Sequence, residues 1–164
     1  VAVDGAPLPR LKPDRVLPGF FGQEILKRKP GAAMRLTVLR DGQKVDVEVT
    51  LGDEPKMVRE AARRYFERLG VTVREFLAAD SILHRAAPSE NAGVVVHFVK
   101  PDSPAAAAGL RPDDWIREVG GVEVEDFAAA VHQLEKIDRD AGAAEIVLLT
   151  RRGGETQVLR IKLN

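Results

Sequence analysis

The order of apolar segments and glycine turns repeats within this chain, and the repeat limits its possible folds more than any other feature. Each half contains, in order, a short strand, a tight Gly-containing turn, a helix, a strand, a Gly-containing hairpin and a last strand. These segments occupy residues 1–51 in the first half and residues 115–163 in the second. The repeat predicts two related structural units in one chain.

The last two strands of each half show the alternation expected of a half-buried hairpin. Apolar and polar residues alternate over residues 45–51 and again over residues 159–163, which predicts strands with one buried and one solvated face. Asp41-Gly42 and Gly153-Gly154 supply residues that tolerate positive φ in the connecting turns.

The boundary between the halves is predicted at Gly52-Asp53-Glu54-Pro55, because Gly and Pro end a strand and the charges keep the segment in water. Residues 1–55 are then a partial unit and residues 56–164 a fuller one. The first unit lacks everything before its first Gly turn. Since the chain opens directly on a strand, without Met or a signal-like segment, we expect it to be part of a longer protein.

The fuller unit mixes short strands with two main helices. We expect helices at residues 57–68 and 127–137, a short helix after Ser103 and Pro104, a loop with one helical turn at 77–92, and strands at 71–73, 93–99 and 115–119, followed by the hairpin. Either Glu125 or Asp126 would cap the second main helix. The predicted class is α+β: a small β-barrel or sandwich of five to six strands capped by two helices, preceded by the partial copy.

Composition excludes several functions. The 25 Lys and Arg balance 25 Asp and Glu, so the chain lacks the excess of positive charge that nucleic acids require. It has no Cys, and no apolar run approaches the length of a membrane-spanning helix. We therefore expect neither nucleic acid nor a membrane span among its partners.

Recognisable catalytic motifs are absent too. The three histidines, at 84, 97 and 132, form no His-Glu-x-x-His motif, and the sequence contains no Gly-x-Ser-x-Gly. Ser103 is explained as a helix cap, and Asp113-Asp114 as turn residues. We predict no catalytic residue, no metal site and no cofactor, and hence no enzyme activity in this chain by itself.

Five segments of the second unit resemble the bacterial PDZ pattern: a valine strand, a Ser-Pro-Ala-Ala helix start, an Ala-Gly-Leu exit, an Asp-x-Ile strand and a Val-Gly-Gly turn. They are residues 93–96, 103–106, 108–110, 114–116 and 119–121. More narrowly, the chain is similar to the tandem PDZ domains of HtrA-type, or DegP-like, serine proteases. Residues 56–164 resemble a complete PDZ domain, and residues 1–55 resemble the rear half of a preceding one.

The resemblance implies a peptide-binding site. PDZ domains add an extended peptide to a sheet edge and hold its carboxylate on loop amides of the pattern x-apolar-Gly-apolar. The matching loop is Arg68, Leu69, Gly70 and Val71. The strand to be extended continues through Thr72, Val73 and Arg74, and the facing helix supplies Phe127, Val131 and Leu134. These groups predict a preference for a hydrophobic C-terminal residue, and Arg59, Arg63, Arg64 and Arg68 on the expected helix could attract the anionic chain end.

Two functions of different classes follow. The first is a peptide-binding module of an HtrA-like protease, with the catalytic His, Asp and Ser upstream of this chain and a periplasmic or other extracytoplasmic location, both implied by the resemblance alone. Its partners would be peptides or unfolded proteins with hydrophobic C-termini. The second is a scaffold whose exposed strand edges bind other subunits, giving a homo-oligomer. A parent protease of another class remains a third alternative.

Overall fold

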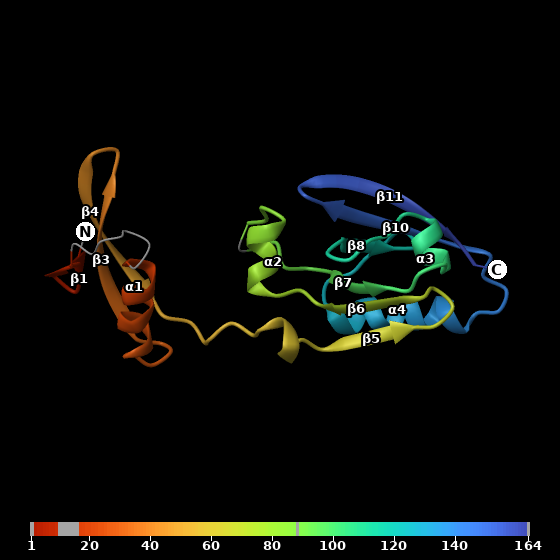
Figure 1. The fold of residues 1–164 in the computed structure, drawn as a ribbon, viewed down its shortest axis with the longest axis horizontal. Coiled ribbons are helices and arrows are strands. Elements are labelled where there is room, and N and C mark those ends of the chain that lie inside the picture. Colours follow the sequence, from red (N-terminus) through yellow and green to blue (C-terminus); the bar gives the residue numbers. More distant parts are fainter. Residues whose placement is uncertain (1, 10–16, 88, 164) are drawn as a thin grey trace. The chain divides into compact units, whose positions relative to one another are not determined.

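The chain divides into two compact units, Val1–Glu54 (unit 1) and Pro55–Asn164 (unit 2). The structure is a computed structural model and describes residues 2–9, 17–87 and 89–163. Figure 1 shows antiparallel strands and short helices in each unit. Each unit has a β-sheet of its own.

The described residues of unit 1 form a four-stranded antiparallel sheet and one helix. The sheet order is β2-β1-β3-β4, and the elements are β1 (Ala2–Val3), β2 (Ala6–Pro7), α1 (Leu17–Leu26), β3 (Ala33–Arg40) and β4 (Gln43–Thr50). The predicted hairpin is confirmed: Asp41 and Gly42 have φ values of 52° and 78°. Along β4, half-buried valines alternate with exposed polar residues, as the period of two requires.

Unit 2 contains a seven-stranded antiparallel sheet within its described residues. The path is β11-β10-β8-β7-β6-β5, with β9 paired to β8. The strands are β5 (Arg63–Phe66), β6 (Val71–Glu75), β7 (Val94–Val99), β8 (Trp115–Val119), β9 (Val122–Glu123), β10 (Glu145–Arg152) and β11 (Glu155–Lys162). The predicted α+β class is confirmed. The strand path is open, with β11 and β5 at its two ends, rather than a closed barrel.

In the part of unit 2 that the structure describes, three α-helices and one 3-10 helix accompany this sheet. They are η2 (Val58–Glu60), α2 (Ala78–Leu83), α3 (Pro104–Ala107) and α4 (Phe127–Arg139). The predicted caps are confirmed: Ser103 Oγ accepts a hydrogen bond from the Ala106 amide at 3.2 Å, and Asp126 accepts one from Ala129 at 2.8 Å. Each cap satisfies a backbone donor that the first helical turn leaves free.

The helix predicted over residues 57–68 is wrong. Its first residues form η2, and Arg63–Phe66 form strand β5, which pairs with β6 along its whole length. The apolar spacing in this segment suits a helix, but helix propensity is a weak preference that tertiary pairing overrides. Tyr65 and Phe66 also have high strand propensity, and pairing with β6 allows Phe66 to become buried.

The segment expected to be mostly loop contains α2, a helix of six residues. A buried ion pair positions it: both guanidinium nitrogens of Arg74 contact the Asp80 carboxylate, at 2.6 and 2.7 Å. The Leu77 amide also donates to Asp80 Oδ2 at 2.7 Å. Because α2 is held by Arg74 of β6, which lies outside the segment 77–92, the residues of that segment alone indicate a helix only weakly.

One core cluster unites the elements of unit 2. Its fully buried members include Phe66, Leu69, Ile116, Leu134 and Leu148, contributed by β5, its loop, β8, α4 and β10. α4 contacts both β5 and β8, and in Figure 1 it lies alongside the strands at this edge of the sheet. The core therefore joins the β5 edge to the rest of the unit.

The two units share a sub-topology. The path β2-β1-β3-β4 in unit 1 has the same order and antiparallel sense as β9-β8-β10-β11 in unit 2, and a helix precedes the final hairpin in both. The tight turns also match: Asp4-Gly5 and Gly120-Gly121 all have positive φ. The repeat seen in the sequence is thus present in the strand order.

His84 is buried beside two aromatic rings and is 1% exposed. Its ring lies 5.4 Å from that of Trp115 and 6.4 Å from that of Phe76, and neither ring nitrogen has a hydrogen-bond partner. Burial lowers the pKa of His84, and Arg151 acts in the same direction, whereas the charges of Asp80, Asp113 and Asp114 oppose the shift. The neutral ring is therefore the form that the fold favours.

This burial predicts a loss of stability in mild acid. Since the folded pKa is lowered, the unfolded state binds more protons once the pH falls below the ordinary histidine pKa of about 6.5. The free energy of unfolding, measured by urea titration between neutral pH and about pH 5, should fall with pH. His84→Leu should flatten this slope, whereas His132→Gln, which alters an exposed histidine, should retain it. If the free energy of unfolding of His84→Leu fell with pH as steeply as that of the wild type, buried His84 would not be the cause of the acid sensitivity.

Candidate peptide-binding groove

Strand β6 is paired on both sides. Its residues from Val71 to Glu75 pair antiparallel with β7, and its first four residues pair antiparallel with β5. Figure 1 shows β5 running beside β6 near α4. The edge predicted to accept a peptide is thus occupied by a strand of the same chain.

The predicted carboxylate loop, residues 68–71, connects β5 to β6. Gly70 has a φ of 70°, and its amide donates to the carbonyls of Phe66 at 2.9 Å and Glu67 at 3.2 Å. The carbonyls of Leu69 and Gly70 accept hydrogen bonds from Ala105 at 3.0 Å and Lys100 at 2.8 Å. The loop is therefore joined to the start of α3 and to the residue after β7.

Arg68 joins the same loop to the C-terminal end of α4. Its amide donates to Asp138 Oδ1 at 3.1 Å. Its guanidinium donates to the carbonyls of Ile137, Asp140 and Ala143, at 3.2, 2.6 and 3.1 Å. A cation at this position also interacts favourably with the negative end of the helix dipole. Arg68 thus acts as a C-terminal cap that holds the loop against α4.

The other arginines do not share a helix face, because that helix does not form. Arg63 donates to the Val58 carbonyl at 2.7 Å, and Arg64 forms an ion pair with Glu135 of α4 at 2.9 Å. Arg59 remains exposed. Together with Arg68, three of the four predicted steering charges therefore engage partners within unit 2.

The apolar groups predicted for the terminal side chain of a peptide lie together in the core cluster. Leu69, Val71 and Leu134 are almost completely buried, and Phe127 and Val131 pack against the cluster while remaining half-buried. Phe66, which the sequence pattern did not single out, is 1% exposed in the same cluster. Its position as the bulky aromatic residue just before the glycine loop is the signal that could have indicated it.

The residues of the predicted binding strand differ in burial and in side-chain partners. Val73 is fully buried, Thr72 is half-buried, and the Arg74 side chain turns to the Asp80 carboxylate of α2. The Arg74 guanidinium also donates to the Glu75 carbonyl at 3.1 Å. Arg74 thus contributes its backbone to the ladder, while its side chain positions α2.

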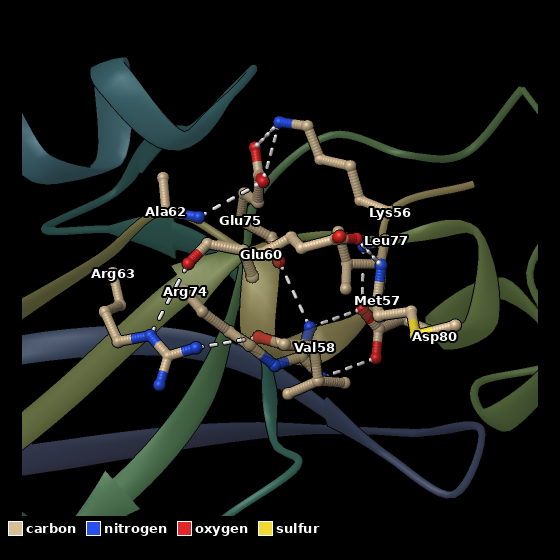
Figure 2. Close-up of polar contacts among 11 residues, drawn as sticks. Lys56, Met57, Val58, Glu60, Ala62, Arg63, Arg74, Glu75, Leu77 and Asp80 are labelled. Carbon is tan, nitrogen blue, oxygen red and sulfur yellow. Dashed lines mark hydrogen bonds and ion pairs between the residues drawn. The ribbon is translucent and has the colours of Figure 1, made fainter. Parts of the chain in front are cut away.

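Glu75 at the end of β6 fastens the segment that precedes β5. Figure 2 shows its carboxylate between Lys56 Nζ, at 2.9 Å, and the Ala62 amide, at 3.1 Å. The Lys56 hydrogen bond, assisted by the Ala62 amide, lowers the pKa of Glu75. Glu75 was also absent from the predicted site. Its partner Ala62 comes from the segment that was expected to be helical, and Lys56 directly precedes that segment.

Within the described residues, no group of three His, Cys, Asp or Glu side chains could hold a metal ion. The helices of this part of the chain also include none that is long and apolar enough to cross a membrane.

Comparison with known proteins identifies similar sequences. Residues 95–139 match the model of the PDZ domain. The chain is 30% identical over 143 residues to a probable periplasmic serine endoprotease, DegP-like, from Ectopseudomonas mendocina, covering 82% of this chain and 28% of that protein. A DegP-like protein of the same description from Chlamydia pneumoniae is 24% identical over 143 residues, covering 87% of this chain and 28% of the relative.

Solved structures with a similar fold include two from HtrA-type proteins. One is the HtrA3 PDZ domain bound to a phage-derived ligand, with 22% identity, a TM-score of 0.45 and coverage of 63% of this chain and 86% of that one. The other is the HtrA-type protease AlgW with a decapeptide, with 25% identity, a TM-score of 0.48 and coverage of 63% and 29%.

Unit 2 therefore contains a PDZ domain, a non-catalytic module. The relatives are of the type that the sequence resemblance indicated, since both carry the DegP-like description. The chain spans 28% of the length of the first two of them.

The geometry of Gly70 makes a direct prediction. A Cβ atom on Gly70 would lie 2.3 Å from Ser103 Cβ, whereas one on Gly109, which also has positive φ, would meet no atom within 4 Å. Gly109→Ala should cost about 1–2 kcal/mol through its backbone conformation. Gly70→Ala should cost roughly a further 1–3 kcal/mol through overpacking.

Urea titrations of the two variants provide the measurement, and adding Ser103→Gly to Gly70→Ala should recover part of the loss by removing the crowded atoms. An equal loss of unfolding free energy in Gly70→Ala and Gly109→Ala would show that the loop can shift to accommodate the added Cβ atom.

Proposed function

We propose that unit 2 binds extended peptides by strand addition to β6, in the groove bounded by α4 and the Gly70 loop, as a regulatory module of an HtrA-like protease. PDZ domains recognise peptides in this mode, in which the backbone pairing supplies affinity and side-chain pockets supply specificity. The partners would be peptides or unfolded proteins that present a hydrophobic C-terminal residue.

The proposal rests on one observation: β6 already pairs with an extended segment of the same chain. β5 pairs antiparallel with β6, the Phe66 side chain enters the core cluster beside Leu69 and Leu134, and the Phe66 carbonyl accepts the Gly70 amide. A peptide ending in this place would use the same ladder, the same apolar environment and an amide of the predicted carboxylate loop.

The protease function itself is a proposal about the longer protein. The relatives named as serine endoproteases are several times longer than this chain, so the catalytic His, Asp and Ser would lie outside it. Their description as periplasmic supports an extracytoplasmic location. Peptide binding would then help to activate or assemble the protease. A different class of parent protease remains the alternative.

We also propose that residues 1–55 are the rear half of a first PDZ copy and residues 56–164 a complete second copy. The support is the shared order of β2-β1-β3-β4 and β9-β8-β10-β11, with matching turns of positive φ. In unit 2 this sub-topology packs against β6, β7 and α3, which have no counterparts among the described residues of unit 1.

Peptide titration tests the binding function. Octapeptides ending in Val, Leu, Ile or Phe should bind the chain in a fluorescence-anisotropy titration, and amidating the C-terminus should weaken binding by about 10- to 100-fold, because a charge-assisted hydrogen bond is lost. Val131→Lys in the groove wall should also weaken binding, whereas His132→Lys on the exposed side of α4 should not. Equal affinity of the amidated peptide would refute the carboxylate assignment, and no binding of any peptide would refute the function.

A second function, subunit assembly through unit 1, is favoured by one surface. A pocket of about 410 Å³ is lined mainly by apolar side chains, including Val3, Leu17, Phe21, Leu36 and Val38. α1 has no buried residue, so its apolar side chains are incompletely covered within the unit.

Light scattering over a range of protein concentrations distinguishes this second function from peptide binding. Assembly through this surface predicts a concentration-dependent mass that Phe21→Asp reduces to that of a monomer. A strict monomer at high concentration would exclude assembly of this chain.

A further inference from the structure

We propose that Arg63–Phe66, strand β5, is a built-in competitor that occupies the PDZ groove, and that its residues indicate the class of external ligand: a bulky apolar terminal residue with a basic residue two positions before it. The inference rests on the proposed peptide-binding function and adds its regulation and its ligand chemistry. An external peptide would have to displace β5 from β6.

The first support is the pairing pattern. A peptide can extend a strand only where backbone donors and acceptors remain unpaired. β6 pairs with β7 through residues 71–75 and with β5 through residues 71–74. Strand addition to β6 and the presence of β5 are therefore mutually exclusive.

The second support is the occupied end of the groove. Phe66, opposite Val71, places its side chain in the cluster that contains Leu69 and Leu134, and its carbonyl accepts the Gly70 amide. The Arg68 amide is engaged as well, by the Asp138 carboxylate. The chain thus occupies the apolar position and two of the loop amides that the end of a peptide would use.

The third support concerns α4. Side chains two apart on a strand share one face, so Arg64 lies on the same side of β5 as Phe66. Its guanidinium lies 2.9 Å from Glu135 of α4, one residue after Leu134. A ligand with a basic residue two positions before its apolar end would reproduce both contacts, and this sets the predicted ligand class.

β5 is also suited to reversible release. It has four residues, whereas the hairpin strands β10 and β11 have eight each, and Arg63, Arg64 and Tyr65 are exposed. The segment before it is held by Lys56, whose side chain is 60% exposed in its pair with Glu75. Short, exposed edge elements open locally at a lower free energy than the whole domain. Release of β5 would expose the apolar cluster that Phe66 covers. A ligand that places its own apolar residue there would bury that cluster again.

The consequence for binding follows from population arithmetic. The apparent dissociation constant equals the intrinsic one divided by the fraction of molecules whose groove is free. Fastening β5 to β6 should therefore abolish binding, and loosening β5 should strengthen it without any change in the groove itself.

A reversible tether tests the inference in the full chain. Tyr65 and Thr72 are directly opposite, Tyr65 is 43% exposed, and the chain has no Cys, so Tyr65→Cys with Thr72→Cys creates a single possible disulfide. The probe is a synthetic octapeptide of the sequence of residues 59–66 with a free carboxylate. Fluorescence anisotropy should show binding in the reduced form and at least roughly tenfold weaker binding in the oxidised form.

The outcomes separate this inference from the function on which it rests. Equal binding by the oxidised and reduced forms would overturn the competitor role and leave peptide binding intact. Absence of binding in both forms, in the wild type and in an Arg64→Ala variant with a loosened β5, would overturn the proposed function and the inference together.

The loosened variant gives an independent readout. Arg64→Ala removes the contact with Glu135 and should strengthen octapeptide binding by roughly threefold, which is the size expected for a partly exposed ion pair. Arg59→Ala, at an exposed arginine before β5, is the matched control and should bind like the wild type. Peptide should also accelerate amide hydrogen exchange in residues 63–66. Unchanged affinity and exchange would contradict displacement of β5.

The ligand class is tested with a second peptide. Replacing the arginine that corresponds to Arg64 with glutamate should weaken binding to the reduced chain by roughly threefold or more, because glutamate would face Glu135. The peptide with glutamate in place of the arginine that corresponds to Arg59 is the control. Equal affinities for the two peptides would overturn the predicted basic position.

Discussion

The pairing of β6 on both of its edges is the interaction on which the rest of unit 2 depends. β7 connects β6 to the remaining sheet, and β5 covers the opposite edge. The side chains of β6 extend this role: Val71 and Val73 enter the core, Arg74 positions α2, and Glu75 fastens the segment before β5. The five residues of β6 thus contact the core, α2 and the segment that leads into β5.

The loop between β5 and β6 connects these strands to α3 and α4. Gly70 can approach Ser103 closely only because it has no Cβ. Arg68 fastens the other side of the loop to the end of α4 by donating to the Ile137 and Asp140 carbonyls. The loop is therefore a shared support for β6, α3 and α4. A ligand that uses the Gly70 amide would have to compete with the hydrogen bonds that this amide already donates to Phe66 and Glu67.

Prediction from sequence worked where the determining contacts are local. The hairpin turns at Asp41-Gly42 and Gly153-Gly154, and the caps of α3 and α4, involve residues at most a few positions apart. Strand β7 was predictable because a continuous run of apolar residues is typical of a strand buried on both faces, and Val94, Val95 and Val96 are fully buried. The PDZ pattern also lies in such segments, and the family model matches residues 95–139, which include α3 and α4 but not the glycine loop.

The repeat of strands and turns, the α+β class, the main strands, the helix caps and the resemblance to PDZ domains could all be predicted from the sequence, because turn geometry, capping and alternation depend on neighbouring residues. Contacts in the folded chain were needed to establish that Arg63–Phe66 is a strand, that Phe66 fills the cluster beside Leu134, and that Arg68 caps α4. These features depend on partners that lie far along the chain, as in the contact of Arg68 with Ala143. When a segment suits both a helix and an edge strand, the free energy of pairing and burial against such partners makes the choice.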